Sequence, residues 1–223
     1  MKDVIHLKTG FKELDELING INERELITIA SRPALGKSTL AIDIINNVSK
    51  QTNNKILYFN LESSKETLSQ RVIGSNVEII NDIHSIEDIK GRCKELKDSF
   101  SFVVIDYFQL ITTSNNYDNV MEEKSYISRM IKTIALEYEI PVIVTSQLPR
   151  FTEERDDKRP NLHNFIVEGS IQQDTDKLIY LYSDDYYKNK PLNELELIVA
   201  KNHGGKLGTV KLKFNHNTYM FEE

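Results

Sequence analysis

The 223-residue sequence has little of several features that mark special classes of protein. Its single cysteine, Cys93, excludes an intrachain disulfide and favours a reducing cytoplasm as the location. No apolar run reaches the length of a membrane span, and the N-terminal MKDVIHLKTG lacks the apolar centre of a signal peptide, so we expect no membrane association. Positive charge is not in excess. The net charge of −6 argues against a protein that coats nucleic acid in general, but it does not exclude a local basic groove.

What the chain does contain is a series of continuous apolar, β-favouring runs. Such runs are typical of strands that are buried on both faces of a parallel sheet. They are LITIA at 26–30, ILYFNL at 56–61, FVVID at 102–106, VIVTS at 142–146 and LIYLY at 178–182.

Helical patterns lie between these runs. Apolar stripes at helical spacing occur over 40–48 and 127–138, and a capping box of Ser85 and Asp88 predicts a helix over 86–97. Cys93 is in register with the apolar side of that helix, which predicts a buried side chain and not a reactive thiol.

The alternation of strand and helix predicts an α/β fold with a mostly parallel central sheet flanked by helices. Near the end, LELIVA, TVKLKF and TYMF read as antiparallel strands added at one edge. We expect one domain over 1–223, with a lead-in helix in 1–22, a core over 23–182 and a C-terminal β extension over 183–223. Loops are expected at 112–124 and 149–164.

Polar residues follow four of the five predicted core strands. In open α/β sheets, ligands bind at the carboxyl ends of the strands, so these residues predict a binding site. They are Ser31 to Ser38, Glu62, Asp106, and Ser146 with Gln147.

The stretch SRPALGKS lies between a predicted strand and an amphipathic helix, as a phosphate-binding loop does. Loop amides and the helix N-terminus attract phosphate, Lys37 reaches the terminal phosphates, and the Ser38 hydroxyl is placed to bind Mg²⁺. Ser31 stands where the usual pattern has its first glycine, and the alternative is an ordinary strand–turn–helix with a chance GKS. The predicted nucleotide-binding residues are Arg32, Pro33, Ala34, Leu35, Gly36, Lys37, Ser38 and Thr39.

Three further strand ends carry candidate catalytic groups. Asp106 follows FVVI and would support Mg²⁺ together with Ser38, although aspartate commonly ends a strand. Glu62 is a candidate general base for water, or else a carboxylate at a helix N-terminus. Gln147 is a candidate contact to the γ-phosphate, or simply the end of a strand.

At this point the chain resembles the RecA-like motor domain of bacterial hexameric replicative helicases of the DnaB type. That family uses an ARP-x-MGK-T loop without the first glycine, so SRPALGKS fits as a variant. The resemblance continues in family order through FNLESS, VVIDYFQLI, VIVTSQLPR, DKRP, EGSIQQDTD, YSDDYY and AKNHGG, over almost the whole chain.

The resemblance implies a RecA-like P-loop NTPase that binds ATP and Mg²⁺, with Lys37, Glu62 and Gln147 as catalytic residues. It implies a hexamer or other homo-oligomer on single-stranded DNA, in which Lys201 and His203 act on a neighbouring subunit's ATP. The loops at 112–124 and 149–164 would face the DNA. Its expected basic contacts are Arg150, Arg155, Lys158 and Arg159.

The chain also departs from the family pattern. His203 stands where AKQRNG has an arginine finger, and an imidazole lacks the permanent charge and the bidentate fork of a guanidinium. Ile166 replaces an expected arginine, the segment from Arg71 to Ile86 is short, and nothing resembles the helicase's N-terminal domain. Acidic residues also balance the basic ones in both expected DNA loops.

Three functional hypotheses follow. The first is a DnaB-type motor domain. The second is a partner or regulator of the same fold that binds ATP, a cellular replicative helicase or its loader, without unwinding DNA. The third, a recombinase or clock-type ATPase of the RecA family, fits SRPALGKS and VIVTSQLPR less well.

Overall fold

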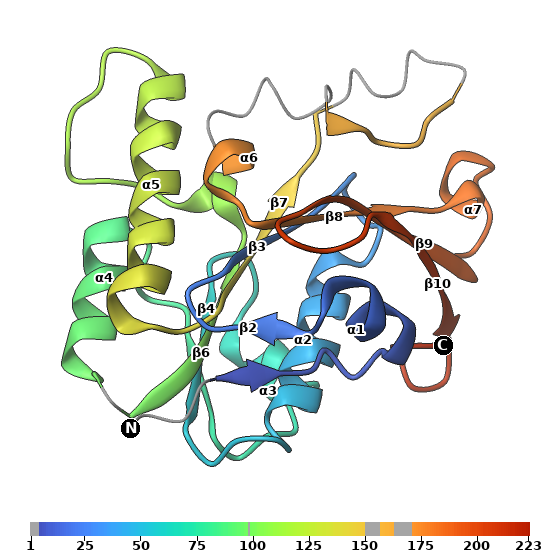
Figure 1. Ribbon diagram of the computed structural model, residues 1–223, viewed down its shortest axis with the longest axis horizontal. Coiled ribbons are helices and arrows are strands. Elements are labelled where there is room, and N and C mark those ends of the chain that lie inside the picture. Colours follow the sequence, from blue (N-terminus) through green and yellow to red (C-terminus); the bar gives the residue numbers. More distant parts are fainter. Residues whose placement is uncertain (1–4, 98, 150–156, 163–170) are drawn as a thin grey trace.

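A computed structural model describes residues 5–97, 99–149, 157–162 and 171–223. A nine-stranded sheet crosses the molecule (Figure 1), in the order β11-β10-β9-β8-β3-β7-β6-β4-β5. Its parallel strands are β3 (Leu26–Ser31), β4 (Lys55–Asn60), β5 (Val77–Ile80), β6 (Phe100–Asp106), β7 (Val142–Gln147) and β8 (Lys177–Tyr182). Antiparallel pairing adds β9 (Glu194–Asn202), β10 (Gly208–Asn215) and β11 (Met220–Glu222), which confirms the predicted fold class.

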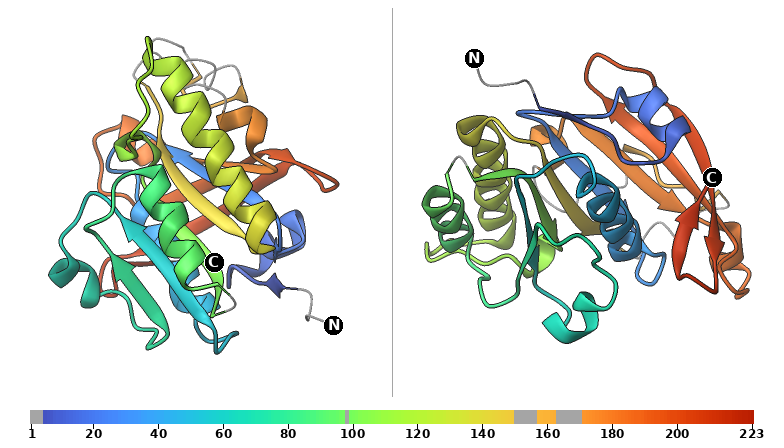
Figure 2. Two further views of the ribbon diagram at one scale, coloured as in Figure 1. Left: turned by 90° about the vertical axis from the view of Figure 1, so that its left-hand side faces the viewer. Right: turned by 90° about the horizontal axis from the view of Figure 1, so that it is seen from below.

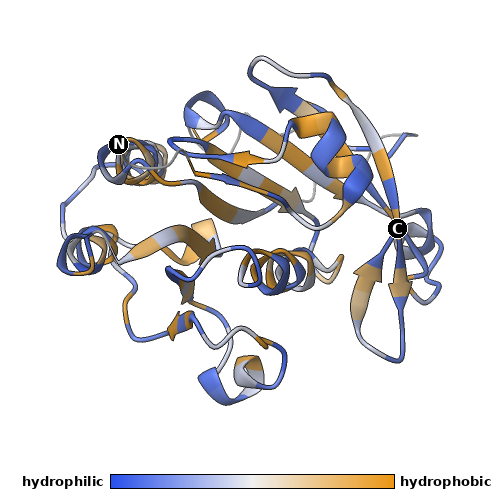
Figure 3. Cartoon of the chain, turned by 60° about the horizontal axis from the view of Figure 1, so that its bottom comes forward, coloured by the Kyte–Doolittle hydropathy of each residue, from blue (hydrophilic) through white to orange (hydrophobic). Residues whose placement is uncertain are grey.

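Helices cover both faces of this sheet (Figure 2). Apolar residues of α1 (Lys12–Ile18) and α2 (Lys37–Val48) share one core with one face of the strands, and residues of α4 (Ile86–Glu95) and α5 (Val120–Tyr138) share a second core with the other face. The remaining helical elements are short: α3 (Lys65–Ser69), η1 (Phe108–Leu110), α6 (Ile171–Asp174) and α7 (Asp184–Tyr187). Figure 3 shows that the central strands are the more hydrophobic part of the molecule.

The continuous apolar runs form strands as predicted, because both of their faces are covered. Every residue of β3, β6 and β8 is buried. The sequence did not reveal β5 (VEII), the edge strand of the sheet, in which Val77, Glu78 and Ile79 are only partly buried. The charged Glu78 interrupts that run, and its carboxylate accepts hydrogen bonds from Lys55 and Arg92.

The predicted cap of α4 is confirmed, since the Ser85 side chain accepts a hydrogen bond from the Asp88 amide. Cys93 is buried on that helix, and burial raises the pKa of its thiol to about 12. The loop predicted over 112–124 is wrong for its last residues, because α5 begins at Val120. There the Asn119 side chain accepts the amide of Glu122 at 2.8 Å and caps the helix.

At the N-terminal end the structure places α1 between two short paired strands, β1 (His6–Leu7) and β2 (Ile21–Asn22). Across the described ranges, none of the helices combines the length and the apolar character needed to cross a membrane.

Candidate nucleotide site

The phosphate-binding loop runs from the end of β3 to the start of α2. Ser31 is the last residue of β3, an extended position that any residue can occupy, so this chain needs no glycine there. Gly36 caps α2 with φ of 86°, in the left-handed region. A Cβ at that position would lie 2.8 Å from the Phe221 ring, so both backbone conformation and space require glycine. In this loop, therefore, Gly36 is a position where only glycine fits.

Lys37, at the first position of α2, is buried with its Nζ directed toward two neighbouring elements. The Nζ lies 3.8 Å from Oε2 of Glu62, just after β4, and 4.6 Å from the centre of the Tyr107 ring, just after β6. Burial, followed by the charges of Glu62 and Asp106, raises the pKa of Tyr107. The structure therefore brings together the predicted lysine and the predicted general base.

Asp106 ends β6 and is completely buried. Its Oδ1 accepts a hydrogen bond from the Thr145 hydroxyl on β7, and its Oδ2 accepts one from the Tyr58 hydroxyl on β4 at 3.2 Å. Asn60 in turn donates to the Tyr58 oxygen at 3.0 Å. Hydroxyl groups from both neighbouring strands thus fix the orientation of this carboxylate.

Gln147 ends β7 opposite Ser31 of β3, so it lies at the same edge as the loop. The next residue, Leu148, is tied to the start of the loop: its amide donates to the Ser31 carbonyl at 2.7 Å, and its carbonyl accepts from Arg32 Nη1 at 2.6 Å. Arg32 is buried, so this guanidinium joins the loop to the end of β7. Sequence reasoning missed Gln109, whose amide contacts the backbone of Gln147.

The sequence predicts Ser38 and Asp106 as ligands of Mg²⁺, and both offer oxygen atoms, the hard ligands that this ion prefers. Their role stays a prediction. Within the described ranges, His, Cys, Asp and Glu side chains form no group of three or more that would hold a metal.

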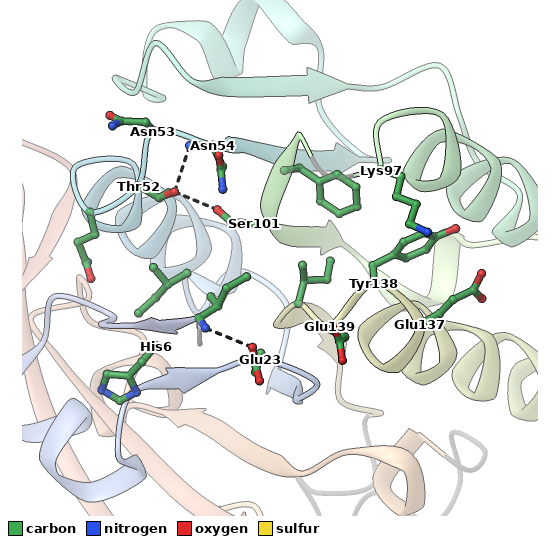
Figure 4. A pocket seen from close by; sticks show the side chains of 15 residues that line it. His6, Glu23, Thr52, Asn53, Asn54, Lys97, Ser101, Glu137, Tyr138 and Glu139 are labelled. Atoms are coloured by element: carbon green, nitrogen blue, oxygen red, sulfur yellow. Dashed lines mark hydrogen bonds between the residues drawn. The ribbon is translucent and has the colours of Figure 1, made fainter. Parts of the chain in front are cut away.

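Two cavities differ in their relation to the loop. A cavity of about 410 Å³ lies beside α2 and is lined by Thr39, Arg71 and Tyr219, among others. A larger cavity of about 790 Å³ is shown in Figure 4. Its lining residues include Asn54, Ser101 and Ile140, which lie within two residues of the first residues of β4, β6 and β7. The larger cavity is therefore at the edge of the sheet opposite the phosphate loop.

Lys201 and His203 also lie on the side opposite the phosphate loop, at the amino-terminal ends of the parallel strands. Strand β9 runs antiparallel to β8, so Asn202 pairs with Lys177, the first residue of β8. The Lys201 Nζ donates to the carbonyls of Gln172 at 2.9 Å and Gln173 at 3.3 Å, and burial lowers its pKa. His203 Nδ1 lies 3.5 Å from Oδ1 of Asp176. This arrangement turns both residues away from the chain's own phosphate loop.

Of the basic residues predicted to contact DNA, Arg150 and Arg155 lie outside the described residues. Ile166, which replaces an arginine expected from the family, also lies outside them. Arg159 donates two hydrogen bonds of 2.9 Å to Glu196, and its guanidinium lies 4.5 Å from the centre of the Tyr182 ring. The pair with Glu196 raises the pKa of Arg159. Lys158 is partly buried.

In the other loop expected to face DNA, at 112–124, the ring of Tyr117 packs against Tyr126 of α5, with ring centres 5.6 Å apart.

The family comparison covers nearly all of the chain. The model described as "DnaB-like helicase C terminal domain" matches residues 6–84 and 79–223. The chain belongs to this family. The resemblance read from the motifs is thereby confirmed, together with the RecA-like ATPase fold.

Individual members of the DnaB-like family agree with this assignment. The chain is 36% identical to "Replicative DNA helicase DnaB" of Geobacillus stearothermophilus and 35% identical to "Replicative DNA helicase DnaC" of Bacillus subtilis; both matches cover 95% of the chain. The chain spans 55% of the length of each of these curated relatives.

Solved structures show the same fold. One of them, described as an "ATPase Domain", matches with a TM-score of 0.87 and 29% identity, over 96% of this chain and 90% of that one. The structure titled "The Structure Of A DnaB-Like Replicative Helicase And Its Interactions With Primase" gives the same TM-score and identity, over 96% of this chain and 61% of that one.

Proposed function

We propose that this chain is the ATP-hydrolysing motor domain of a DnaB-type replicative DNA helicase that acts on single-stranded DNA. The observation that supports this proposal is the gathering of Lys37, Glu62, Asp106 and Gln147 at one edge of the sheet. They follow or end β3, β4, β6 and β7, which are neighbours in the sheet. Edges of this kind are where open α/β sheets bind ligands.

ATP would be held first through its phosphates. The amides of the loop and the N-terminus of α2 provide donors for phosphate oxygens, and Lys37 adds a positive point charge. Ser38 and Asp106 would hold Mg²⁺, which when bound neutralises charge on the phosphates. Because the Asp106 oxygens already accept hydrogen bonds from Thr145 and Tyr58, the carboxylate is fixed before the ion arrives.

Glu62 is the proposed general base. Its side chain is 51% exposed, so water reaches it, and its carboxylate lies 3.8 Å from the Lys37 ammonium. A γ-phosphate that pairs with Lys37 would release Glu62 to accept a proton from the attacking water. Gln147, at the end of β7, would contact the γ-phosphate from the other side of the loop.

The nucleoside would occupy the cavity of about 410 Å³ beside α2. Thr39 follows the phosphate loop directly, and its hydroxyl accepts a hydrogen bond from Arg71 at 3.0 Å. The Tyr219 ring is 65% exposed and lines the same cavity. A planar guanidinium and an exposed aromatic ring are suited to the two faces of a base.

Self-association and DNA binding complete the proposal. Lys201 and His203, at the edge opposite the phosphate loop, would act on the site of a neighbouring subunit in a hexamer or other homo-oligomer. The segments 112–124 and 149–164 would contact single-stranded DNA, with Arg150, Arg155, Lys158 and Arg159 as the basic groups. The alternative of a partner protein without motor function is not favoured, because the relatives are replicative helicases.

The test combines nucleotide binding with turnover. Wild-type protein, Lys37→Ala and the control Lys50→Ala, which changes an exposed lysine just beyond α2, are titrated with a fluorescent ATP analogue. ATP hydrolysis is then measured with single-stranded DNA. We expect Lys37→Ala alone to lose affinity by about tenfold or more, since it removes the charge that pairs with phosphate. Equal affinities for all three proteins would remove the assigned phosphate site.

A further inference from the structure

Strands β6 and β7 separate at their carboxyl ends, the ends that carry the proposed nucleotide site. Pairing between these strands ends at Ile105 and Val144. On its other side, β7 continues to pair with β3 as far as Ser31 and Gln147. The chain meanwhile leaves β6 after Asp106 and enters η1. The last residues of β7 therefore extend beyond the strand ladder on the β6 side.

The side chain of Gln109, in η1, fills this position. Its Oε1 accepts a hydrogen bond from the Gln147 amide at 3.1 Å, and its Nε2 donates to the Gln147 carbonyl at 3.1 Å. Nε2 also donates to the Ser146 hydroxyl at 2.9 Å. A primary amide presents an acceptor and donors in one plane, as a peptide group does. Gln109 thus provides the pairing that another strand would give.

The backbone around Gln109 is itself anchored. Lys124 of α5 donates from Nζ to the carbonyl of Gln109 at 3.2 Å and to that of Ile111 at 2.8 Å. The Lys124 side chain is 16% exposed, and burial lowers its pKa. A continuous set of contacts therefore leads from α5 through η1 to the last residue of β7.

We propose that Gln109 is a positioning residue for Gln147, a role that rests on the proposed contact between Gln147 and the γ-phosphate. Gln109 fixes both main-chain groups of Gln147, and through them the direction of its side chain. Loss of the Gln109 amide leaves the phosphate loop and Lys37 in place, so ATP still binds. The Gln147 backbone then gains freedom, and the geometry for hydrolysis is lost.

Gln109→Met keeps the side-chain length and removes the three hydrogen bonds to Ser146 and Gln147. The chain offers a matched control in Gln51→Met: the Gln51 amide pairs in the same way with the amide and carbonyl of Lys8, at 2.9 and 2.8 Å, near the opposite edge of the sheet. Both variants lose similar contacts, so both are expected to lose some thermal stability. Only Gln109→Met is expected to change the turnover of ATP, and this difference distinguishes the two variants.

For Gln109→Met we expect kcat to fall by about tenfold or more, with the affinity for a fluorescent ATP analogue within about twofold of wild type. Gln51→Met should keep the wild-type kcat. In a Gln147→Ala background, Gln109→Met should lower kcat no further, since the residue that it positions is gone. An equal loss of kcat in both backgrounds, or no loss in either, would overturn the positioning role.

A second measurement does not depend on turnover. Hydrogen exchange at the Gln147 amide, followed by NMR, should be faster by about tenfold or more in Gln109→Met, while exchange at Val144 stays unchanged. Unchanged exchange at Gln147 would refute the positioning role even if ATP turnover were absent. Absence of ATP binding and turnover in the wild type would instead refute the proposed function.

Discussion

The ammonium of Lys37 lies 3.8 Å from a carboxylate oxygen of Glu62, across the gap between the start of α2 and the end of β4. Lys37 is 10% exposed at its side chain and Glu62 is 51% exposed, so the pair joins a buried cation to a carboxylate that solvent reaches. A phosphate group bound in the proposed site would compete with Glu62 for this cation. Binding of the nucleotide would then be linked to release of the carboxylate.

Glu62→Gln should separate binding from hydrolysis. The change removes the anion that competes for Lys37, so affinity for ATP should be retained or increased. It also removes the group that accepts the proton from water, so turnover should fall by about 10²–10⁴-fold. Binding and steady-state hydrolysis are measured for Glu62→Gln and for Glu66→Gln, a nearby surface carboxylate on α3. Wild-type turnover in Glu62→Gln would assign the base elsewhere.

His203→Arg should raise ATP hydrolysis, because a guanidinium adds a permanent charge and a bidentate fork where imidazole offers a single hydrogen bond. An increase of about tenfold or more is expected by analogy with the large effect of arginine fingers. Turnover is measured over a concentration series with single-stranded DNA. The increase should occur only where subunits associate.

Lys206→Arg provides the control for that experiment, since it adds a guanidinium in the same exposed turn without replacing the imidazole. No increase for His203→Arg in a confirmed oligomer would show that this segment does not reach the neighbouring phosphate.

Asp43 should make stability depend on pH. Burial is the main cause that raises the pKa of this carboxyl from 3.8 to about 6, and the Phe221 amide donates to it at 2.9 Å. The folded state therefore binds more protons than the unfolded state between about pH 4 and 6, and stability falls as pH rises through this window. At about 1.36 kcal/mol per unit, the loss is up to about 3 kcal/mol.

Asp43→Asn keeps an oxygen for the Phe221 amide and removes the charge. Urea unfolding at about pH 4.5, 6 and 8 should show the variant gaining stability over wild type as pH rises. A constant difference across the three pH values would contradict the assignment.

Tyr219→Ala should weaken ATP binding by about tenfold, since stacking of a base on an aromatic ring contributes about 1–3 kcal/mol. Affinity for inorganic triphosphate, measured by competition, should stay unchanged because the phosphate loop is intact. Tyr219→Phe retains the ring and should bind ATP as wild type does. Equal weakening toward ATP and triphosphate would place the nucleoside elsewhere.

The residues that could be found from the sequence are those whose position follows from strand order alone. Glu62, Asp106 and Gln147 each follow an apolar run, and parallel strands bring their carboxyl ends to one edge. Gln109 could not be found in this way. Its only signal is a polar residue within DYFQLI, and its contact depends on β6 and β7 separating at one particular step.

Arg32 shows a second limit. Its place in the phosphate loop predicted contact with the nucleotide, and that remains a prediction, yet its guanidinium is directed to the Leu148 carbonyl. A long side chain can turn toward ligand or protein, and sequence gives no information on which. Strand β5 was missed because an edge strand has no continuous apolar pattern.

Lys37 and His203 lie at opposite edges of one sheet, and this placement affects how many complete catalytic sites an assembly of subunits would contain. If His203 acts on a neighbouring subunit as proposed, a single subunit carries two different parts of a catalytic site and cannot join them to each other. Subunits that associate head to tail complete one site at each junction, so an open row always has one junction fewer than it has subunits. Closing the row adds one complete site without adding a subunit. Turnover per subunit would therefore report whether the assembly is open or closed.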